Sequence, residues 1–233
     1  AYLSGGLDMV LAVEEEKCQL LHTFGLNVNL GPVCDITTDP NAFLFDRSLG
    51  QDVMTTADVV FCIIWKMSSQ NMGSVLKHFP GYGNNVDTHT GIAIDTRPLE
   101  TFLEQDFLPF SGGLAAGGDT AAVLVSHNIV KSMDDQLPAS LSPAVHKLLR
   151  EDLGFDGVIM TDSLDMNAIT LYTGDRASAV QAVLSGNDLL CCSTYWKQVP
   201  AVLDAVREGV ISEERINESV LRVLKLKAEF GII

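Results

Sequence analysis

Basic residues are scarce in this sequence, which contains 15 lysines and arginines against 30 aspartates and glutamates. The formal net charge is −15 at pH 7. A protein this acidic repels phosphate backbones, so nucleic acid is not expected as a partner. Long hydrophobic runs are also missing. Because a spanning helix needs about 18 or more consecutive apolar residues, no membrane span is expected.

Cysteines are few and are not arranged as pairs for a metal or a disulfide framework. The sequence has five, an odd number, and no Cys-x-x-Cys spacing. Buried free thiols are expected, which favours a reducing, cytoplasmic location. The sequence begins "AYLSGG" and shows no signal-peptide pattern. A secretion or lipid-anchor signal upstream remains the alternative, with the protein at the bacterial cell surface.

Signatures of phosphate and cofactor binding are absent. The sequence contains no Gly-x-Gly-x-x-Gly, no P-loop and no Gly-x-Ser-x-Gly elbow. The glycine-rich segment 111–119 follows a predicted helix, whereas a phosphate cradle follows a strand. His78, His127 and Asp162 could be assembled around a metal, but no spacing motif requires one. We therefore expect neither a cofactor nor a metal.

Short apolar runs alternate with helical patterns along the whole chain. Such runs are typical of parallel strands that are covered on both faces. The expected strands are 26–36, 73–79, 121–130, 156–162 and 187–192, and the clearest helices are 7–25, 96–110, 142–154 and 212–231. Ser142 and Ser212 are predicted N-caps, and Pro143 a first helical residue. The pattern predicts one α/β domain over residues 1–233, either a barrel or an open doubly wound sheet.

Polar residues follow four of the five predicted strands. The first run ends in Asp35, the second in Lys77 and His78, the third reaches His127, and the fourth ends in Asp162. In a (β/α)8 barrel the carboxyl ends of the strands meet on one face, where active sites are built. These side chains therefore predict a site at that face.

Each of these residues also has a structural interpretation. Asp162 could be a nucleophile, but it could equally cap a helix, and Asp165 is a rival for the nucleophile. Lys77 and His78 are consecutive, so both reach one site only where the strand ends or bulges. His78 could otherwise be an ordinary core histidine.

Two further candidates lie in predicted loops. Asp87 stands two residues from His89, and a carboxylate beside an imidazole fixes its tautomer and favours a proton shuttle. An ordinary solvated loop is the alternative. Arg47 lies in "FDRSLG", where its guanidinium could hold sugar hydroxyls or a carboxylate, or simply pair with Asp46 or Asp52.

Several segments, taken together, resemble glycoside hydrolase family 3, in the branch of bacterial β-N-acetylhexosaminidases. The segments are "GLNVNLGPVCDI", "DRSLG", "KHFPGYGNNVDTH" and "LGFDGVIMTDSLDM", and they occur in the order of the family. The resemblance covers nearly the whole chain. It implies a (β/α)8 TIM-barrel-type fold, here with about five of the eight β/α units, because no segment matches the family's first three strands or its Asp-x-Glu-Gly-Gly stretch.

The resemblance also implies roles for individual residues. Asp162 is expected to be the nucleophile, and His89 the acid/base, oriented by Asp87. The residues expected to hold the sugar or to line its pocket are Arg47, Lys77, His78, His127 and Asp35. The sequence departs from the family pattern at Tyr82, where histidine is usual, at Asn84, where aspartate is common, and at Thr88, where serine is usual.

The implied activity is retaining hydrolysis of terminal β-linked N-acetylglucosamine from cell-wall or chitin-type fragments, through a covalent glycosyl-enzyme. A histidine acid/base departs from the usual pair of carboxylates. One alternative is a β-glucosidase or β-xylosidase of the same family, against which the Asp-Thr-His segment argues. Another is a non-catalytic sugar-binding protein or an inactive truncated form. A carbohydrate is the expected partner, and self-association through an open barrel edge is a further expectation.

Overall fold

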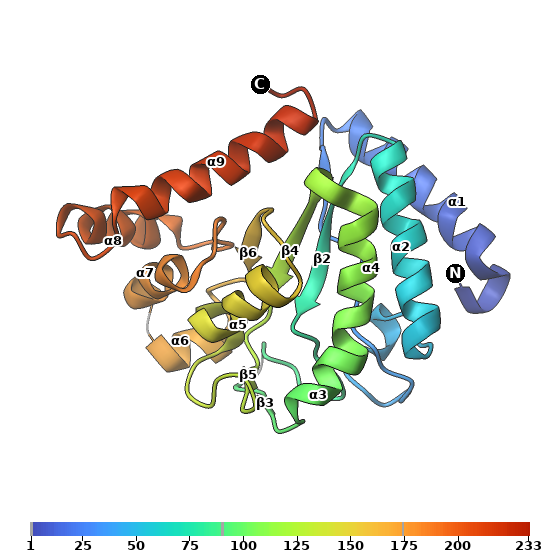
Figure 1. The fold of residues 1–233 in the computed structure, drawn as a ribbon, viewed down its shortest axis with the longest axis horizontal. Helices are drawn as coiled ribbons and strands as arrows, with labels where there is room; N and C mark the ends of the chain where they lie inside the picture. The colour runs from blue at the N-terminus through green and yellow to red at the C-terminus, as the bar shows by residue number, and fades with distance from the viewer. Residues whose placement is uncertain (1, 90, 174) are drawn as a thin grey trace.

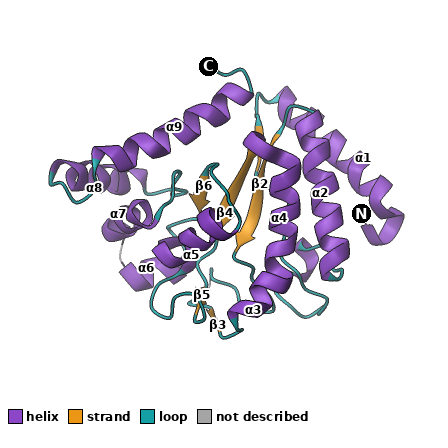
Figure 2. Ribbon diagram, in the orientation of Figure 1, coloured by secondary structure: helices purple, strands orange, loops and turns teal. Residues whose placement is uncertain are grey.

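The computed structural model describes residues 2–89, 91–173 and 175–233. Helices surround a small central sheet, as Figure 1 and Figure 2 show. The strands are β1 (Val28–Asn29), β2 (Gly73–Phe79), β3 (Ile94–Asp95), β4 (Ala121–Val125), β5 (Ile129–Val130) and β6 (Ile159–Thr161). The α-helices are α1 (Tyr2–Thr23), α2 (Val53–Ser69), α3 (Leu99–Thr101), α4 (Phe107–Gly117), α5 (Pro143–Lys147), α6 (Asn167–Thr173), α7 (Asp175–Ser185), α8 (Tyr195–Arg207) and α9 (Glu213–Glu229).

The main sheet is parallel and has the strand order β1-β2-β4-β6. The predicted strand 187–192 contributes one parallel bridge, between Leu189 and Met160. The predicted single strand 121–130 is wrong in one respect. Its first half is β4, while β5 pairs with β3 in a separate two-stranded sheet. In Figure 1 that small sheet lies beyond the ends toward which the arrows of β2 and β4 point.

Side chains of the central strands alternate between two apolar clusters, as expected for a sheet covered on both faces. Leu76, Val123 and Val125 belong to a cluster that also contains Phe79 and Phe110 and is packed against the helices. Val75, Ala122 and Leu124 lie in the other cluster, together with Val223 and Leu226 of α9. The core thus fixes the strands, and with them the positions of the residues at the strand ends.

Helix boundaries follow the predicted capping signals. The Ser142 hydroxyl accepts a hydrogen bond from Val145 N at 3.2 Å, and the Ser212 hydroxyl accepts one from Arg215 N at 3.1 Å. Pro143 is the first residue of α5. Each cap satisfies a backbone donor that the helix itself leaves free. These predictions are confirmed.

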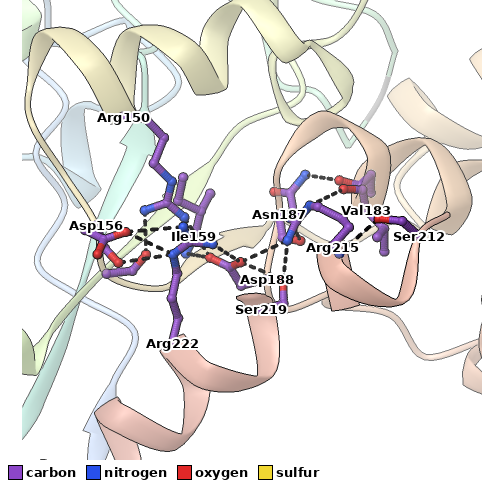
Figure 3. Close-up of polar contacts among 12 residues, drawn as sticks. Arg150, Asp156, Ile159, Val183, Asn187, Asp188, Ser212, Arg215, Ser219 and Arg222 are labelled. Carbon is purple, nitrogen blue, oxygen red and sulfur yellow. Dashed lines mark hydrogen bonds and ion pairs between the residues drawn. The ribbon is translucent and has the colours of Figure 1, made fainter. Parts of the chain in front are cut away.

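A buried ionic cluster attaches α9 to the amino-terminal end of β6 (Figure 3). The Asp188 carboxylate is fully buried and lies 2.8 Å from Arg150, 3.3 Å from Arg222 and 3.6 Å from Arg215. It also accepts hydrogen bonds from the Ser219 hydroxyl and from Ile159 N. Because the carboxylate is surrounded by donors, its burial is compensated. The cluster therefore fixes the carboxyl-terminal helix against the sheet.

Strand β1 pairs only with β2 among the described residues, so its other edge faces away from the sheet. A groove of about 740 Å³ runs beside this edge, and residues of α1, including Val10 and Val13, line its far side. Asn29 donates a hydrogen bond to Glu14 across the groove, at 3.3 Å. Helix α1 thus partly covers the edge that was expected to be open. The described part of the chain contains no helix long and apolar enough to cross a membrane.

Candidate active site

The candidate residues that end the strands lie at one end of the sheet, the carboxyl end of its parallel strands. Pairing with β2 continues beyond β1, since Cys34 N donates to the Lys77 carbonyl at 2.6 Å, and this places Asp35 beside the end of β2. Asp162 follows β6 directly, and its N–H donates to the Val125 carbonyl at 3.0 Å. The parallel register therefore brings together groups that are far apart in sequence.

Strand β2 changes register just before it ends. Leu76 is paired with Val123 and Phe79 with Val125, so β2 uses one residue more than β4 over this stretch. Such an irregularity redirects side chains that would otherwise alternate between faces. For both Lys77 and His78 to reach one site, the strand had to end or bulge here. It does so, and both residues interact with residues of the site.

His78 is fixed by Asp35. The Asp35 Oδ2 atom accepts hydrogen bonds from His78 Nδ1 at 2.7 Å and from His78 N at 3.1 Å. Because a carboxylate only accepts, Nδ1 carries the proton and Nε2 is free to accept. Arg47 Nη2 lies 3.3 Å from that Nε2 atom and donates to it.

Asp35, His78 and Arg47 thus form a chain of hydrogen bonds that leads from a buried residue to an exposed one. Asp35 is 2% exposed and His78 4%, whereas Arg47 is exposed at the surface. The Asp35 Oδ1 atom accepts from Tyr82 N at 2.7 Å, so both carboxylate oxygens already have protein donors. Asp35 thus orients the group beside it, and contact of Asp35 with a sugar stays a prediction.

Lys77 is half-buried within the same group of charges. Its pKa is lowered, because burial disfavours the ammonium and Arg47 lies nearby. The charges of Asp162 and Asp35 oppose this shift without cancelling it. The lysine therefore lies within the electrostatic field of the predicted nucleophile.

Asp162 does not cap the helix that follows it. Helix α6 begins only at Asn167, and the Asp162 Oδ1 atom accepts from the N–H of the next residue, Ser163, at 2.7 Å. Its side chain is half-buried at the strand end. Asp162 is therefore not the helix N-cap that the sequence also allowed. A carboxylate at the end of a strand can act as a nucleophile.

Asp165, the rival position, is committed to a neighbouring loop. Its carboxylate accepts hydrogen bonds from the Ser193 backbone, from the Ser193 hydroxyl at 2.6 Å and from the Thr194 hydroxyl at 2.6 Å. Burial raises its pKa, but these hydrogen bonds outweigh burial and the net pKa is lowered. Asp165 therefore connects the loop after β6 to the loop before α8.

His127 is a buried, neutral histidine that supports the loop carrying Asp162. Its Nε2 donates to the Ser163 carbonyl at 2.9 Å, and its Nδ1 accepts from the Ser140 hydroxyl at 2.7 Å. Burial lowers its pKa, although the charge of Asp162 acts in the opposite direction. His127 is fully buried and both of its nitrogens are occupied, so any direct contact with a sugar stays a prediction.

The loop between β2 and β3 carries the predicted dyad. The Asp87 Oδ1 atom accepts from His89 Nδ1 at 2.6 Å and from His89 N at 2.9 Å. The histidine side chain is 60% exposed and that of Asp87 27%. Burial tends to raise the pKa of Asp87, but the hydrogen bonds from His89 prevail and lower it. The arrangement leaves His89 Nε2 as the atom that can exchange a proton with a ligand.

A contact within this loop was not anticipated from the sequence. The Tyr82 hydroxyl is hydrogen-bonded to the Thr88 hydroxyl and accepts from Thr88 N at 3.3 Å. Both residues were noted only as departures from the family pattern. The sequence contains one indication of this contact, which is that both departures from the family pattern fall in the same loop.

A second buried ion group supports the turn at the end of β2. Arg97 pairs with Asp95 at 2.8 Å and with Asp106 at 2.9 Å, and it donates to the Gly81 carbonyl at 3.3 Å. Gly81 has φ of +119°, and a Cβ there would collide with Asp106. Glycine is therefore required where the strand turns into the loop.

Within the described ranges, no group of three or more histidine, cysteine, aspartate or glutamate side chains is arranged to hold a metal ion.

Residues 4–226 match the family model "Glycosyl hydrolase family 3 N terminal domain". The chain belongs to this family. Beta-hexosaminidase LpqI of Mycobacterium tuberculosis is 30% identical over 233 residues, which are 95% of this chain and 59% of LpqI. A beta-hexosaminidase of Xanthomonas campestris is 33% identical over 181 residues, 77% of this chain and 54% of that protein.

Solved structures of the family agree with this assignment. A glycoside hydrolase family 3 beta-N-acetylglucosaminidase from Paenibacillus sp. str. FPU-7 matches with a TM-score of 0.92 and 33% identity, over 98% of this chain and 44% of that one. The fold is thus of the TIM-barrel type, with four strands in the main sheet here. The chain spans about half the length of the relatives it matches.

Proposed function

We propose that the protein hydrolyses terminal β-linked N-acetylglucosamine residues with retention of configuration. The observation that carries the proposal is the Asp87–His89 pair on the loop after β2, and its proximity to Asp162 is supported by the charges of both His89 and Asp162 acting on the buried His127. A strand-end carboxylate and a carboxylate-oriented imidazole supply the two groups that a double displacement requires. The names of the relatives support the substrate class.

In the first step, Asp162 attacks the anomeric carbon, and the bond between that carbon and the leaving oxygen breaks. His89, protonated on both nitrogens, donates its Nε2 proton to that oxygen. In the second step, the neutral Nε2 accepts a proton from water, and the resulting hydroxide displaces Asp162 from the sugar. Asp87 holds the ring through Nδ1 in both steps, and its lowered pKa keeps it ionised at neutral pH.

The remaining polar groups bind and orient the sugar. Arg47 and Lys77 present donors at the same face, and His78 is held in one tautomer by Asp35. Donors in fixed positions lose little entropy when hydroxyl groups bind.

The test compares hydrolysis of aryl β-N-acetylglucosaminide and aryl β-glucoside by the full chain. Faster turnover of the N-acetylglucosaminide supports the proposal. A preference for the glucoside would favour the β-glucosidase alternative, and binding of N-acetylglucosamine without turnover of either compound would favour a sugar-binding protein.

A further inference from the structure

Tyr82 and Thr88 form a buried contact across the base of the loop that carries the dyad. Tyr82 is 3% exposed and Thr88 is fully buried. Burial raises the pKa of Tyr82 to about 12, and the protonated phenol shares a hydrogen bond with the Thr88 hydroxyl. The phenol oxygen in turn accepts from Thr88 N. Two hydrogen bonds thus join the same two residues without competition from water.

The other end of Tyr82 contacts the Asp35–His78 pair. Its N–H donates to Asp35 Oδ1 at 2.7 Å, and its ring meets the His78 ring edge-on with centroids 5.6 Å apart. Tyr82 therefore touches both partners of the Asp35–His78 pair. A displacement of Tyr82 would therefore disturb both the Asp35–His78 pair and the loop that carries Asp87 and His89.

Thr88 is held on a second side as well. Its carbonyl accepts from Ala168 N, in the first turn of α6, at 3.4 Å. Thr88 stands between Asp87 and His89, so the residue that is fixed lies at the centre of the dyad segment. The His89 side chain itself is 60% exposed and makes its ring hydrogen bond to Asp87. Its position therefore depends on how firmly Thr88 is held.

We infer that Tyr82 and Thr88 are positioning residues that hold the Asp87–His89 pair at the site through their shared hydroxyl contact. This inference rests on the proposed function for its catalytic consequence. Without the contact, the loop samples more conformations, and fewer of them place Nε2 beside the leaving oxygen. Proton donation should suffer most, while attack by Asp162 should change little.

The test uses Tyr82→Phe and Thr88→Val, each of which removes one hydroxyl and keeps the shape. Tyr172→Phe is the matched control, because its hydroxyl bonds the Gln136 carbonyl at an exposed position, at 2.7 Å. For both variants, kcat/KM on substrates with poor leaving groups should fall about tenfold, the usual effect of one buried hydrogen bond. On activated aryl glycosides, whose glycosylation step needs no acid, kcat/KM should fall less than about threefold.

Thr88→Ser has a hydroxyl where Thr88→Val has none. Its kcat/KM on both substrate types should therefore lie within about twofold of the value for the parent protein. Equal losses on both substrate types, or a Thr88→Ser protein as impaired as Thr88→Val, would overturn the inference. If Tyr82→Phe folds poorly, the comparison of Thr88→Val with Thr88→Ser still decides the question.

A readout independent of activity separates this inference from the proposed function. Amide hydrogen exchange over residues 83–89 should speed up in Tyr82→Phe, with exchange in β2 and β4 unchanged, even if the protein hydrolyses no glycoside. Unchanged exchange in this loop would contradict the positioning role. If exchange speeds up while no N-acetylglucosaminide is hydrolysed by the parent protein, the proposed function fails and the contact stands.

Discussion

Asp35 receives two hydrogen bonds from His78, one from the ring at 2.7 Å and one from the backbone at 3.1 Å, although 43 positions separate the two residues. The contact is buried, and it joins the segment after β1 to the end of β2. It determines which ring nitrogen of His78 carries the proton. The orientation of the His78 ring therefore depends on a residue that is itself almost inaccessible.

Asp35→Asn should weaken substrate binding more than turnover. An amide nitrogen in place of Oδ2 would face two donors of His78, so the ring should turn away from its present position. We expect KM to rise about tenfold and the free energy of unfolding to fall by about 1–3 kcal/mol. Steady-state kinetics and denaturant unfolding measure the two effects. Asp39→Asn, which makes the same change near Asn41 further along the same loop, is the control, and an equal KM change in it would argue against this account.

His89→Ala should affect substrates according to their leaving groups. Loss of the acid should lower kcat/KM by about 10²–10⁴ for substrates that need protonation, and far less for activated aryl glycosides. Kinetics on a series of aryl leaving groups measures the difference. His22→Ala removes an exposed histidine elsewhere and should change neither class. A uniform loss across the series would assign His89 a structural role.

Acid should destabilise the fold through its buried histidines. Burial lowers the pKa of His127 and of His146. Between these lowered values and the ordinary histidine pKa of about 6.5, the unfolded chain binds more protons than the folded one. Stability is therefore fully present above about pH 6.5 and is lost as pH falls through the folded values.

Denaturant unfolding at a series of pH values from 8 to 5 measures this effect. His146→Asn keeps a donor where His146 Nδ1 now meets the Ser142 carbonyl at 2.8 Å, but it removes the titrating ring. Its stability should depend less on pH than that of the parent protein. An unchanged pH dependence would mean that His146 does not contribute to it.

Removal of Asp188 should destabilise the protein strongly. Asp188→Asn would leave Arg150, Arg215 and Arg222 without the buried carboxylate they surround, as Figure 3 shows. Breaking a buried ion group in this way costs about 3–5 kcal/mol of unfolding free energy. Arg207→Ala, at a far more exposed ion pair, should cost less than about 1 kcal/mol. Similar costs for the two changes would show that the cluster is not compensated as described.

The sequence predicted the strand ends better than the helices. Short apolar runs ending in Asp35, His78 and Asp162 are the pattern expected of a parallel sheet whose two faces are covered. Helix α2 was missed, because "VMTTADVVFCIIWKMSS" is rich in valine and isoleucine, and its helical state depends on packing and on the Asp52 cap. Tertiary packing, which a single sequence does not display, decided that segment.

The contacts within the site required the structure. His127 was expected to lie close to the pocket, but only the fold shows that Ser140 and Ser163 occupy both of its nitrogens. His127 itself lies where the predicted strand 121–130 is interrupted, between β4 and β5. Likewise, the pairing of Tyr82 with Thr88 depends on how a short loop folds back, and the alternation of apolar and polar residues does not encode this.

The most direct test of the account is to identify the residue that forms the covalent intermediate. A 5-fluoro-N-acetylglucosaminyl fluoride should inactivate the full chain, because the fluorine destabilises the positively charged transition state and slows release of the ester. Peptide mapping by mass spectrometry should place the sugar on Asp162, and Asp162→Asn should be inactive and unlabelled while remaining folded. A label on Asp165 or on Asp35 would contradict the account, as would undiminished hydrolysis by Asp162→Asn.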